Sequence, residues 1–484
     1  MLDPTILSAF ELADAIRRRQ LTARQVVDAH ISRLSATQAQ INAVAADRYQ
    51  QAQARADEID SQIGRMAMKE IDALALLPLL TGVPFTVKES FAVEGMPNTA
   101  GVLARAGHLA GGTATVVARL IEAGAIPVAV TNTSELTLWI ESENRVYGRT
   151  NNPYDLTRTA GGSSGGDGAA VAVGGSPFGV AADLAGSIRI PALFCGVFGH
   201  KPTSGLVPST GMWPAPPGGA VKLLSVGPIA RRASDLMPLL QIMAGLHGND
   251  PSMVAAQLRD PAEVQLEGLT VTLVEGGGLR AMGRELRDAR ERAAGALAAS
   301  GAQVRRIDLP SWKGMVMPFI AALKDTGNPS SAVRALLAQA GEPDTGLTRL
   351  LLGGAGGHTI PTRLALLADA LPSSLFGGRS TLLRRAEVFA NELQDAIGDG
   401  VLLHPAYPTV APRHHHTYGR PWLLAQAAAF NLAGVPVTEA PLGFSRSGLP
   451  LGVQVAASPG ADHVSIAVAV ELEAVFGGWT PPRL

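Results

Sequence analysis

The chain of 484 residues carries 40 basic and 41 acidic side chains, a net charge of −1 and 46% hydrophobic residues. A chain this long and this apolar can bury a large core, which excludes disorder as a description of the whole. The balanced charge, without a basic tract, argues against nucleic-acid binding. The single cysteine, Cys195, excludes an internal disulfide framework and a Cys-rich metal site.

The N-terminal segment has an early acidic residue, no basic stretch before an apolar one and no small-residue cleavage site, so a signal peptide is not expected. No window reaches about 18 uninterrupted apolar residues, so no membrane-spanning helix is expected either. These features predict a cytoplasmic protein.

The first part of the chain predicts helices followed by an α/β unit. Apolar side chains recur every three or four residues over 4–60, which indicates helices. The run GVPFTVKES (82–90) is typical of a buried strand and contains Lys88. Residues 113–124 predict a helix and residues 125–133 another strand. Strand, helix and strand in this order indicate a βαβ unit in a parallel or mixed sheet.

Residues 161–227 hold 16 of the 54 glycines and few charges. Apolar runs such as AAVAV and IRIPALF are interleaved with these glycines, which is not typical of a flexible linker. We therefore expect the glycines to permit positive φ angles and close backbone approach inside a packed region.

The C-terminal half predicts a second α/β region. Strands at 269–276 and 303–310 flank a helix at 281–300 and form a second βαβ unit. Residues 315–400 are predicted to be mostly helical, with a Gly-rich break at 353–357. Three further strands and a closing helix are expected at 401–412, 434–444, 449–458 and 462–476.

The Gly-rich segment RTAGGSSGGDGAA (158–170) allows three interpretations. As a phosphate loop it fails, because the Walker pattern requires Gly-Lys-Ser/Thr and residue 167 is Asp, whose carboxylate would repel phosphate. As a dinucleotide fingerprint it lacks the spaced glycines directly after a strand. As a nucleophile elbow, Gly-x-Ser-x-Gly matches twice, centred on Ser163 and on Ser164, but no histidine partner is selected.

A second serine, Ser187, follows the small pair Ala185–Gly186. Small residues before a serine let backbone N–H groups converge on one point, as an oxyanion requires. Asp183 and Arg189 flank this serine in a nearly uncharged region, and if buried they are expected to neutralise each other.

Lys88 is the third member of this set. It is one of only six lysines and lies on an apolar strand, where burial favours the neutral amine that can act as a base. Taken singly, a lysine at a strand end is usually solvated and Ser–Gly runs are usually turns. The joint pattern is what indicates chemistry.

Three segments together resemble the amidase signature family: GVPFTVKES around Lys88, NPYDLTRTAGGSSGG (152–166) and DLAGSIRIPALFCGVFGHKPT (183–203). The spacings also fit, with 75 residues from Lys88 to Ser163 and 24 from Ser163 to Ser187. The resemblance implies an α/β fold with a large mixed, mostly parallel sheet sandwiched between α-helices. It also implies a single domain over 1–484, which we divide into an N-terminal helical region (about 1–70), a signature core (about 75–240) and a C-terminal α/β part (about 264–484).

The resemblance further implies hydrolysis of carboxamides through an acyl-enzyme. Ser187 is the implied nucleophile, Ser163 the bridging serine on a cis Gly162–Ser163 peptide, and Lys88 the base. The implied oxyanion donors are the backbone N–H groups of Leu184, Ala185, Gly186 and Ser187. Ser164 is expected to be a supporting hydrogen-bond partner. Residue 185 is Ala where the family commonly has Gly, so the loop must tolerate an ordinary backbone there.

Within that family, residues 196–214, 404–416 and 463–479 look closest to the type 2 fatty-acid amide hydrolases, which implies an apolar acyl pocket for acyl or aryl amides. The candidate lining residues, each of which could equally be ordinary core packing, are Trp139, Ile140, Phe194, Met212, Trp213 and Phe319.

Other features point to no further chemistry. His414–His416 could suggest a metal, but three adjacent side chains cannot easily all face one ion and no acidic cluster accompanies them, so no metal and no cofactor are expected. Cys195 lies in an apolar run and is expected to be core. The expected partner is a small amide, with a homodimer possible. The alternatives are a glutaminase subunit that releases ammonia for a partner protein, and a catalytically silent binding protein on the same fold.

Overall fold

The computed structural model describes residues 2–66, 76–215, 218–248, 250, 253–255, 257–275, 281–325, 332–341, 357–369 and 378–484. Its centre is an eleven-stranded sheet in the order β1-β3-β2-β8-β10-β9-β14-β15-β13-β11-β12. In chain order the strands are β1 (Val44–Asp47), β2 (Pro84–Lys88), β3 (Ile126–Thr131), β8 (Phe178–Asp183), β9 (Phe198–Lys201), β10 (Ser225–Ala230), β11 (Thr270–Glu275), β12 (Gln303–Asp308), β13 (Val401–His404), β14 (Val437–Phe444) and β15 (Pro450–Ala457).

Parallel pairing forms two blocks of the sheet. In one block β2 lies parallel to both β3 and β8, and in the other β11 lies parallel to both β12 and β13. The strands between the blocks, and β1 at one edge, pair antiparallel. The expected large mixed sheet between helices is confirmed, and its middle is antiparallel because strands from distant parts of the chain, such as β9 and β14, meet there.

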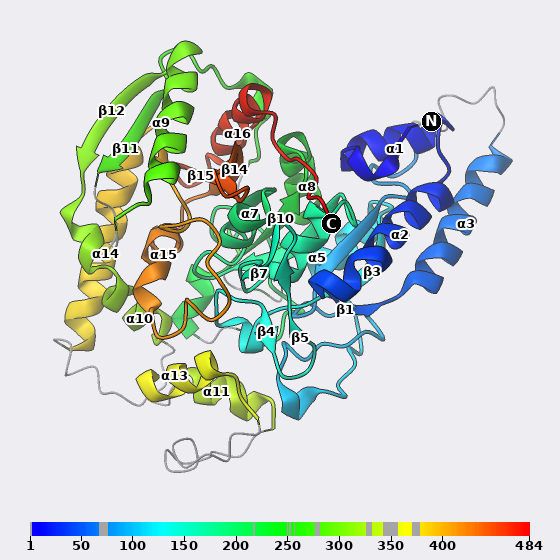
Figure 1. Ribbon diagram of the computed structural model, residues 1–484, viewed down its shortest axis with the longest axis horizontal. Coiled ribbons are helices and arrows are strands. Elements are labelled where there is room, and N and C mark those ends of the chain that lie inside the picture. Colours follow the sequence, from blue (N-terminus) through cyan, green and yellow to red (C-terminus); the bar gives the residue numbers. More distant parts are fainter. Residues whose placement is uncertain are drawn as a thin grey trace.

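Helices cover both faces of this sheet (Figure 1). They are α1 (Ala9–Arg17), α2 (Ala23–Ile41), α3 (Tyr49–Arg65), α5 (Thr115–Glu122), α6 (Gly165–Ala172), α7 (Arg189–Cys195), α8 (Leu236–Met243), α9 (Arg284–Ala299), α10 (Val316–Leu323), α11 (Ala332–Gln339), α13 (Ile360–Asp369), α14 (Arg379–Ile397), α15 (Ala425–Leu432) and α16 (Asp462–Phe476). Two small hairpins are formed by β4 (Glu143–Asn144) with β5 (Gly148–Arg149), and by β6 (Asn151–Asn152) with β7 (Asp155–Thr159).

Figure 1 shows α1, α2 and α3 at one end of the molecule and β11, β12 and α9 at the other, with α11 and α13 together at the lower margin. Among the described residues, no helix combines the length and the apolar character that crossing a membrane would require.

Both predicted βαβ units are confirmed, since β2 and β3 flank α5, β11 and β12 flank α9, and each pair of strands is parallel. The prediction of helix throughout 4–60 is wrong at β1. This strand is only four residues long and pairs with distant β3, so its local periodicity carried no strand signal. The strand expected over 401–412 ends at His404. Most of the Gly-rich break at 353–357 lies outside the described residues.

Two wholly buried helices connect this sheet to the chemistry. Strand β2 ends at Lys88 and its parallel neighbour β8 ends at Asp183, so both chain segments leave the sheet at the same edge. Helix α6 begins just after Ser163 and Ser164, and α7 begins just after Ser187. The carboxyl edge of parallel strands is where α/β proteins commonly bind ligands.

Candidate active site

Lys88 is the last residue of β2 and is fully buried. A hydrogen bond of 2.6 Å joins its Nζ to Ser163 Oγ. Burial lowers the pKa of Lys88 to about 7, against the opposing charges of Asp167 and Asp183. The predicted buried amine is thus present, with a substantial neutral fraction at neutral pH.

Hydrogen bonds to its backbone carbonyl hold Ser163 in place. The hydroxyls of Thr133 and Ser142 donate to its carbonyl oxygen at 2.8 and 3.0 Å. The Gly162–Ser163 peptide is cis, as expected from the family resemblance. The neighbouring Ser164 hydroxyl, expected to be a supporting partner, is buried without a hydrogen-bond partner among the described residues. Its carbonyl instead accepts the N–H of Gly168 as α6 begins.

Ser187 lies in the short loop between β8 and α7, and its shape depends on Asp183. The Asp183 carboxylate accepts the N–H of Gly186 at 2.7 Å and that of Ile188 at 3.1 Å. Gly186 has φ +115, and a Cβ there would lie 2.6 Å from the Cβ of Ala427, so the position requires glycine. Among the described residues, no hydrogen bond joins Ser187 Oγ to Ser163.

Asp183 and Arg189 form the expected buried pair. Two hydrogen bonds of 2.9 Å link the guanidinium to the carboxylate, and both side chains are fully buried. Arg189 also donates to Gln454 Oε1 and Asn431 Oδ1. Burial alone would raise the pKa of Asp183, but the Arg189 charge holds that pKa well below its ordinary value. The loop of Ser187 is therefore fixed by an ionised, compensated carboxylate.

The same contacts correct part of the predicted oxyanion site. The Gly186 N–H already donates to Asp183, so its donor is directed at the carboxylate. For the N–H groups of Leu184, Ala185 and Ser187, the described part of the chain provides no such partner. Ala185 is not among the residues with positive φ, which agrees with the ordinary backbone expected there.

Lys88, Ser163 and Ser187 line one small cavity of about 30 Å³. Its other walls are mainly apolar: Leu136, Thr137, Leu138, Ala182, Leu184, Met212, Pro214, Leu224 and Leu336. The expected Met212 is therefore at the site. Two serine hydroxyls and a buried amine thus share one small cavity with mainly apolar walls.

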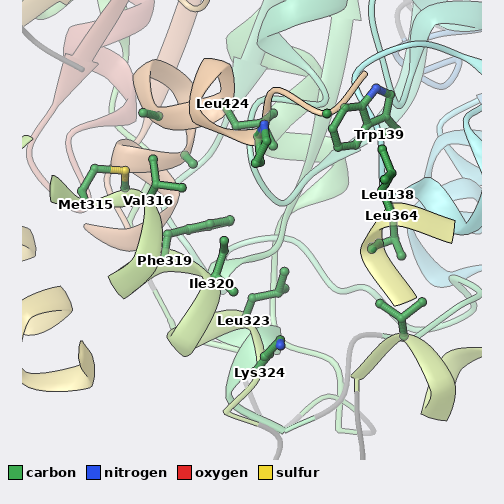
Figure 2. Close-up of a pocket in the computed structure, with 16 residues that line it drawn as sticks. Leu138, Trp139, Met315, Val316, Phe319, Ile320, Leu323, Lys324, Leu364 and Leu424 are labelled. Carbon is green, nitrogen blue, oxygen red and sulfur yellow. The ribbon is translucent and has the colours of Figure 1, made fainter. Parts of the chain in front are cut away.

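A larger apolar cavity of about 210 Å³ adjoins this one, and Leu138 lines both. Figure 2 shows side chains of α10 along one side of the larger cavity and Trp139 with Leu138 along the opposite side. The Trp139 indole is fixed by donating from Nε1 to Thr417 Oγ1 at 2.8 Å, and Thr417 donates in turn to Glu141. Phe319 also lines this cavity, as expected.

Helix α13 supplies part of the wall and is anchored by Glu135. The Thr359 N–H and hydroxyl donate to Glu135 Oε2 at 2.7 and 2.8 Å, and His358 Nδ1 lies 2.6 Å from Oε1. Residues 136–138, which directly follow Glu135, line the small cavity of Lys88, Ser163 and Ser187.

Three predicted lining residues lie elsewhere. Phe194 is buried in α7 with its ring edge-on to Tyr407, because α7 turns that side into the core. Ile140 is buried in the main core. Trp213 stacks under the guanidinium of Arg105. Sequence reasoning missed Val316 and Ile320, whose only signal is the strongly apolar composition of VMPFIAAL (316–323). It also missed Met315 and Leu424, which lie outside that run.

Two sequence features remain, the histidines at 414–416 and Cys195. No group of three metal-ligating side chains occurs there, and His415 Nε2 contacts Glu143 Oε2 at 2.9 Å. Cys195 is buried, its S–H donates to the Ala160 carbonyl, and burial raises the pKa of its thiol. Cys195 is thus core, as expected.

Comparison with known proteins identifies the family. The family described as Amidase matches residues 25–465. The chain is 39% identical to fatty-acid amide hydrolase 2 of Homo sapiens over 99% of this chain and 90% of that protein. It is 31% identical to an acylamidase of Rhodococcus erythropolis over 97% of this chain and 95% of that protein. A crystal structure of an amidase superposes with a TM-score of 0.79 at 29% identity, covering 97% of this chain and 100% of that one. The chain belongs to the amidase signature family and is an enzyme that hydrolyses amide bonds.

Proposed function

We propose that the enzyme cleaves amides through an acyl-enzyme on Ser187, with Ser163 as proton bridge and Lys88 as base. The observation that carries this proposal is the 2.6 Å hydrogen bond between Lys88 Nζ and Ser163 Oγ at a cavity that Ser187 also lines. A nucleophile activated through a bridging hydroxyl needs this order of groups.

The proposed acylation step moves one proton each way. As Ser187 Oγ attacks the amide carbonyl carbon, its proton passes to Ser163 Oγ while the Ser163 proton passes to neutral Lys88. Collapse of the tetrahedral intermediate breaks the C–N bond, and the proton returns through Ser163 to the leaving nitrogen. Water then attacks the ester by the same relay and releases the carboxylate.

The developing oxyanion would be received by the N–H groups of Leu184, Ala185 and Ser187. The Asp183 carboxylate contributes by fixing the loop through Gly186 and Ile188. Donors fixed in advance stabilise the transition state without reorganisation, which is usually the largest electrostatic contribution to catalysis.

For the substrate, we propose amides with an apolar acyl or aryl part. The adjoining cavity of about 210 Å³ has almost entirely apolar walls, and a chain leaving the Ser187 site past Leu138 would enter it. Each methylene buried there contributes about 0.8 kcal/mol. This wall chemistry disfavours the glutaminase alternative, because the polar side chain of glutamine would lose its hydration without gaining partners.

The tests are Ser187→Ala and covalent labelling with an alkyl fluorophosphonate. The variant should lose turnover of an acyl amide while keeping the circular dichroism spectrum of the wild type, and the label should be found on Ser187 by peptide mass spectrometry. Retained turnover in the variant would overturn the proposal. Wild-type protein that neither turns over amides nor takes the label would favour the silent binding protein.

We also propose that residues 1–484 form one domain. Strands from the N-terminal region, the signature core and the C-terminal part share one continuous sheet, and a sheet shared in this way supports a single core.

A further inference from the structure

Asp167 is a buried acid that the mechanism above does not use. It lies in the first turn of α6, four residues after Ser163, and is fully buried. The Thr86 hydroxyl donates to its Oδ1 at 3.0 Å. Its Oδ2 has no hydrogen-bond partner among the described residues. A buried carboxyl oxygen without a partner costs free energy, so its presence calls for an explanation.

The surrounding backbone makes room for this carboxyl group. Thr86 and Lys88 are two residues apart on β2, so their side chains project from the same face of the sheet. Opposite Thr86, on β8, stands Gly179. A Cβ at Gly179 would lie 2.7 Å from Asp167 Oδ1 and 2.8 Å from Thr86 Oγ1. The space that a side chain would fill is thus occupied by the Asp167 carboxyl group.

The charges of two acids on neighbouring elements, Asp167 on α6 and Asp183 on β8, act on Lys88. Asp183 is already compensated by Arg189. The adjacent Glu89 is directed elsewhere, because it accepts from Thr99, Ala100 and Tyr147. Asp167 is therefore the acid whose charge acts on Lys88 and whose Oδ2 has no hydrogen-bond partner among the described residues.

We propose that Asp167 is a positioning residue for Lys88, and that its carboxylate stabilises the ammonium that Lys88 becomes each time Ser187 attacks. This inference rests on the proposed function. The proton that leaves Ser187 through Ser163 creates a positive charge on Lys88 inside an apolar site. Asp167 keeps its own charge throughout, and the proton leaves Lys88 again when the leaving nitrogen is protonated.

The ionisation of Asp167 fits this role. Burial raises its pKa to about 7, while the side chains of Thr131 and Thr86 and the charge of Lys88 favour the ionised form. Above this pH Asp167 is ionised, and above about the same pH Lys88 is neutral. The counter-charge is thus available in the pH range where the base is.

The test is the pH profile of kcat and kcat/KM in Asp167→Asn, which keeps the shape of the side chain and removes its charge. Without the anion, the pKa of Lys88 should fall, so the acid limb should move to lower pH by about one unit. The kcat at alkaline pH should also fall, because the ammonium formed in the transition state loses its counter-charge. A lower kcat with an unmoved acid limb would mean a purely structural role and would overturn the inference.

Two further variants secure the result. Thr86→Val removes a hydrogen bond that favours the Asp167 anion and should move the limb in the same direction by less, so it decides the question if Asp167→Asn does not fold.

Asp235→Asn is the matched control, since Asp235 is equally buried but binds the N–H groups of Ala9 and Phe10. Its acid limb should stay in place. If Ser187→Ala remains active, the proposed function fails. If it is inactive and neither Asp167→Asn nor Thr86→Val moves the limb, only this inference fails.

Discussion

Two buried lysine–serine pairs occur among the described residues, and only one of them lines a cavity together with Ser187. Lys88 is hydrogen-bonded to Ser163 at 2.6 Å, and Lys201, at the end of β9, to Ser225 at 3.1 Å. Both lysines are fully buried, and burial lowers the pKa of each to about 7. By chemistry alone the two amines are equivalent bases.

Their surroundings separate them. Lys201 Nζ and Ser225 Oγ both also donate to the Pro202 carbonyl, at 2.9 and 3.1 Å, which closes the second pair on itself. Lys201 lines neither the small cavity of Lys88, Ser163 and Ser187 nor the larger apolar cavity. The first pair shares its cavity with Ser187. A buried amine with a lowered pKa is thus insufficient for catalysis, and access to the substrate decides between structural and chemical roles.

The largest expected difference between the pairs is in activity. Lys88→Met should lower kcat/KM for an acyl amide by about 10²–10⁴-fold, the range for loss of general base catalysis. Lys201→Met should retain most of the wild-type activity. Both variants should be assayed beside their thermal unfolding curves, so that loss of fold is distinguished from loss of chemistry. Equal losses of activity in two folded variants would contradict the distinction.

The next difference is in the pH profile. Lys88 accepts a proton as the pH falls through about 7, and a protonated Lys88 cannot act as a base. The kcat/KM of the wild type should therefore fall on the acid side of about pH 7. Lys201→Met should show the same acid limb, because the closed pair takes no part in the reaction. If the acid limb disappeared in Lys201→Met, the titrating group would be Lys201 and not Lys88, which would contradict this prediction.

The smallest expected effect is on stability. An unfolded lysine has a pKa near 10.5, so between about pH 7 and 10.5 the unfolded chain holds a proton that the folded chain has lost. The free energy of unfolding should rise across this window, with each lysine contributing a slope of up to about 1.4 kcal/mol per pH unit. Lys201→Met should flatten that slope, as urea unfolding at a series of pH values would measure. An unchanged slope would mean that Lys201 stays charged in the folded protein.

Sequence reasoning identified the features that depend on short stretches of the chain. Lys88, Ser163 and Ser187 were found from three short motifs and their spacing, and the two βαβ units from periodicity. The Asp183 contact with Gly186 was not foreseen, because the direction of an N–H depends on how the whole loop closes. Strand β1 was missed because it exists through its pairing with β3.

The pocket was predicted in part for the same reason. Trp139, Phe319 and Met212 line the two cavities, whereas Phe194 turns into the core. Aromatic composition indicates burial, but it does not say which side of a buried helix meets empty space. That depends on how α10, α13 and α15 pack, which is set by contacts between distant segments.

The anchoring of α13 on Glu135 has a mechanical consequence. One carboxylate holds the start of this helix, and the three residues after it form the wall beside Ser187. Leu364 of α13 lines the larger cavity (Figure 2). Leu366 of α13 also packs in one apolar cluster with Leu136. A bulky chain that presses on Leu364 therefore loads the short segment 136–138 beside Ser187 through two contacts, the Glu135 carboxylate and this apolar cluster.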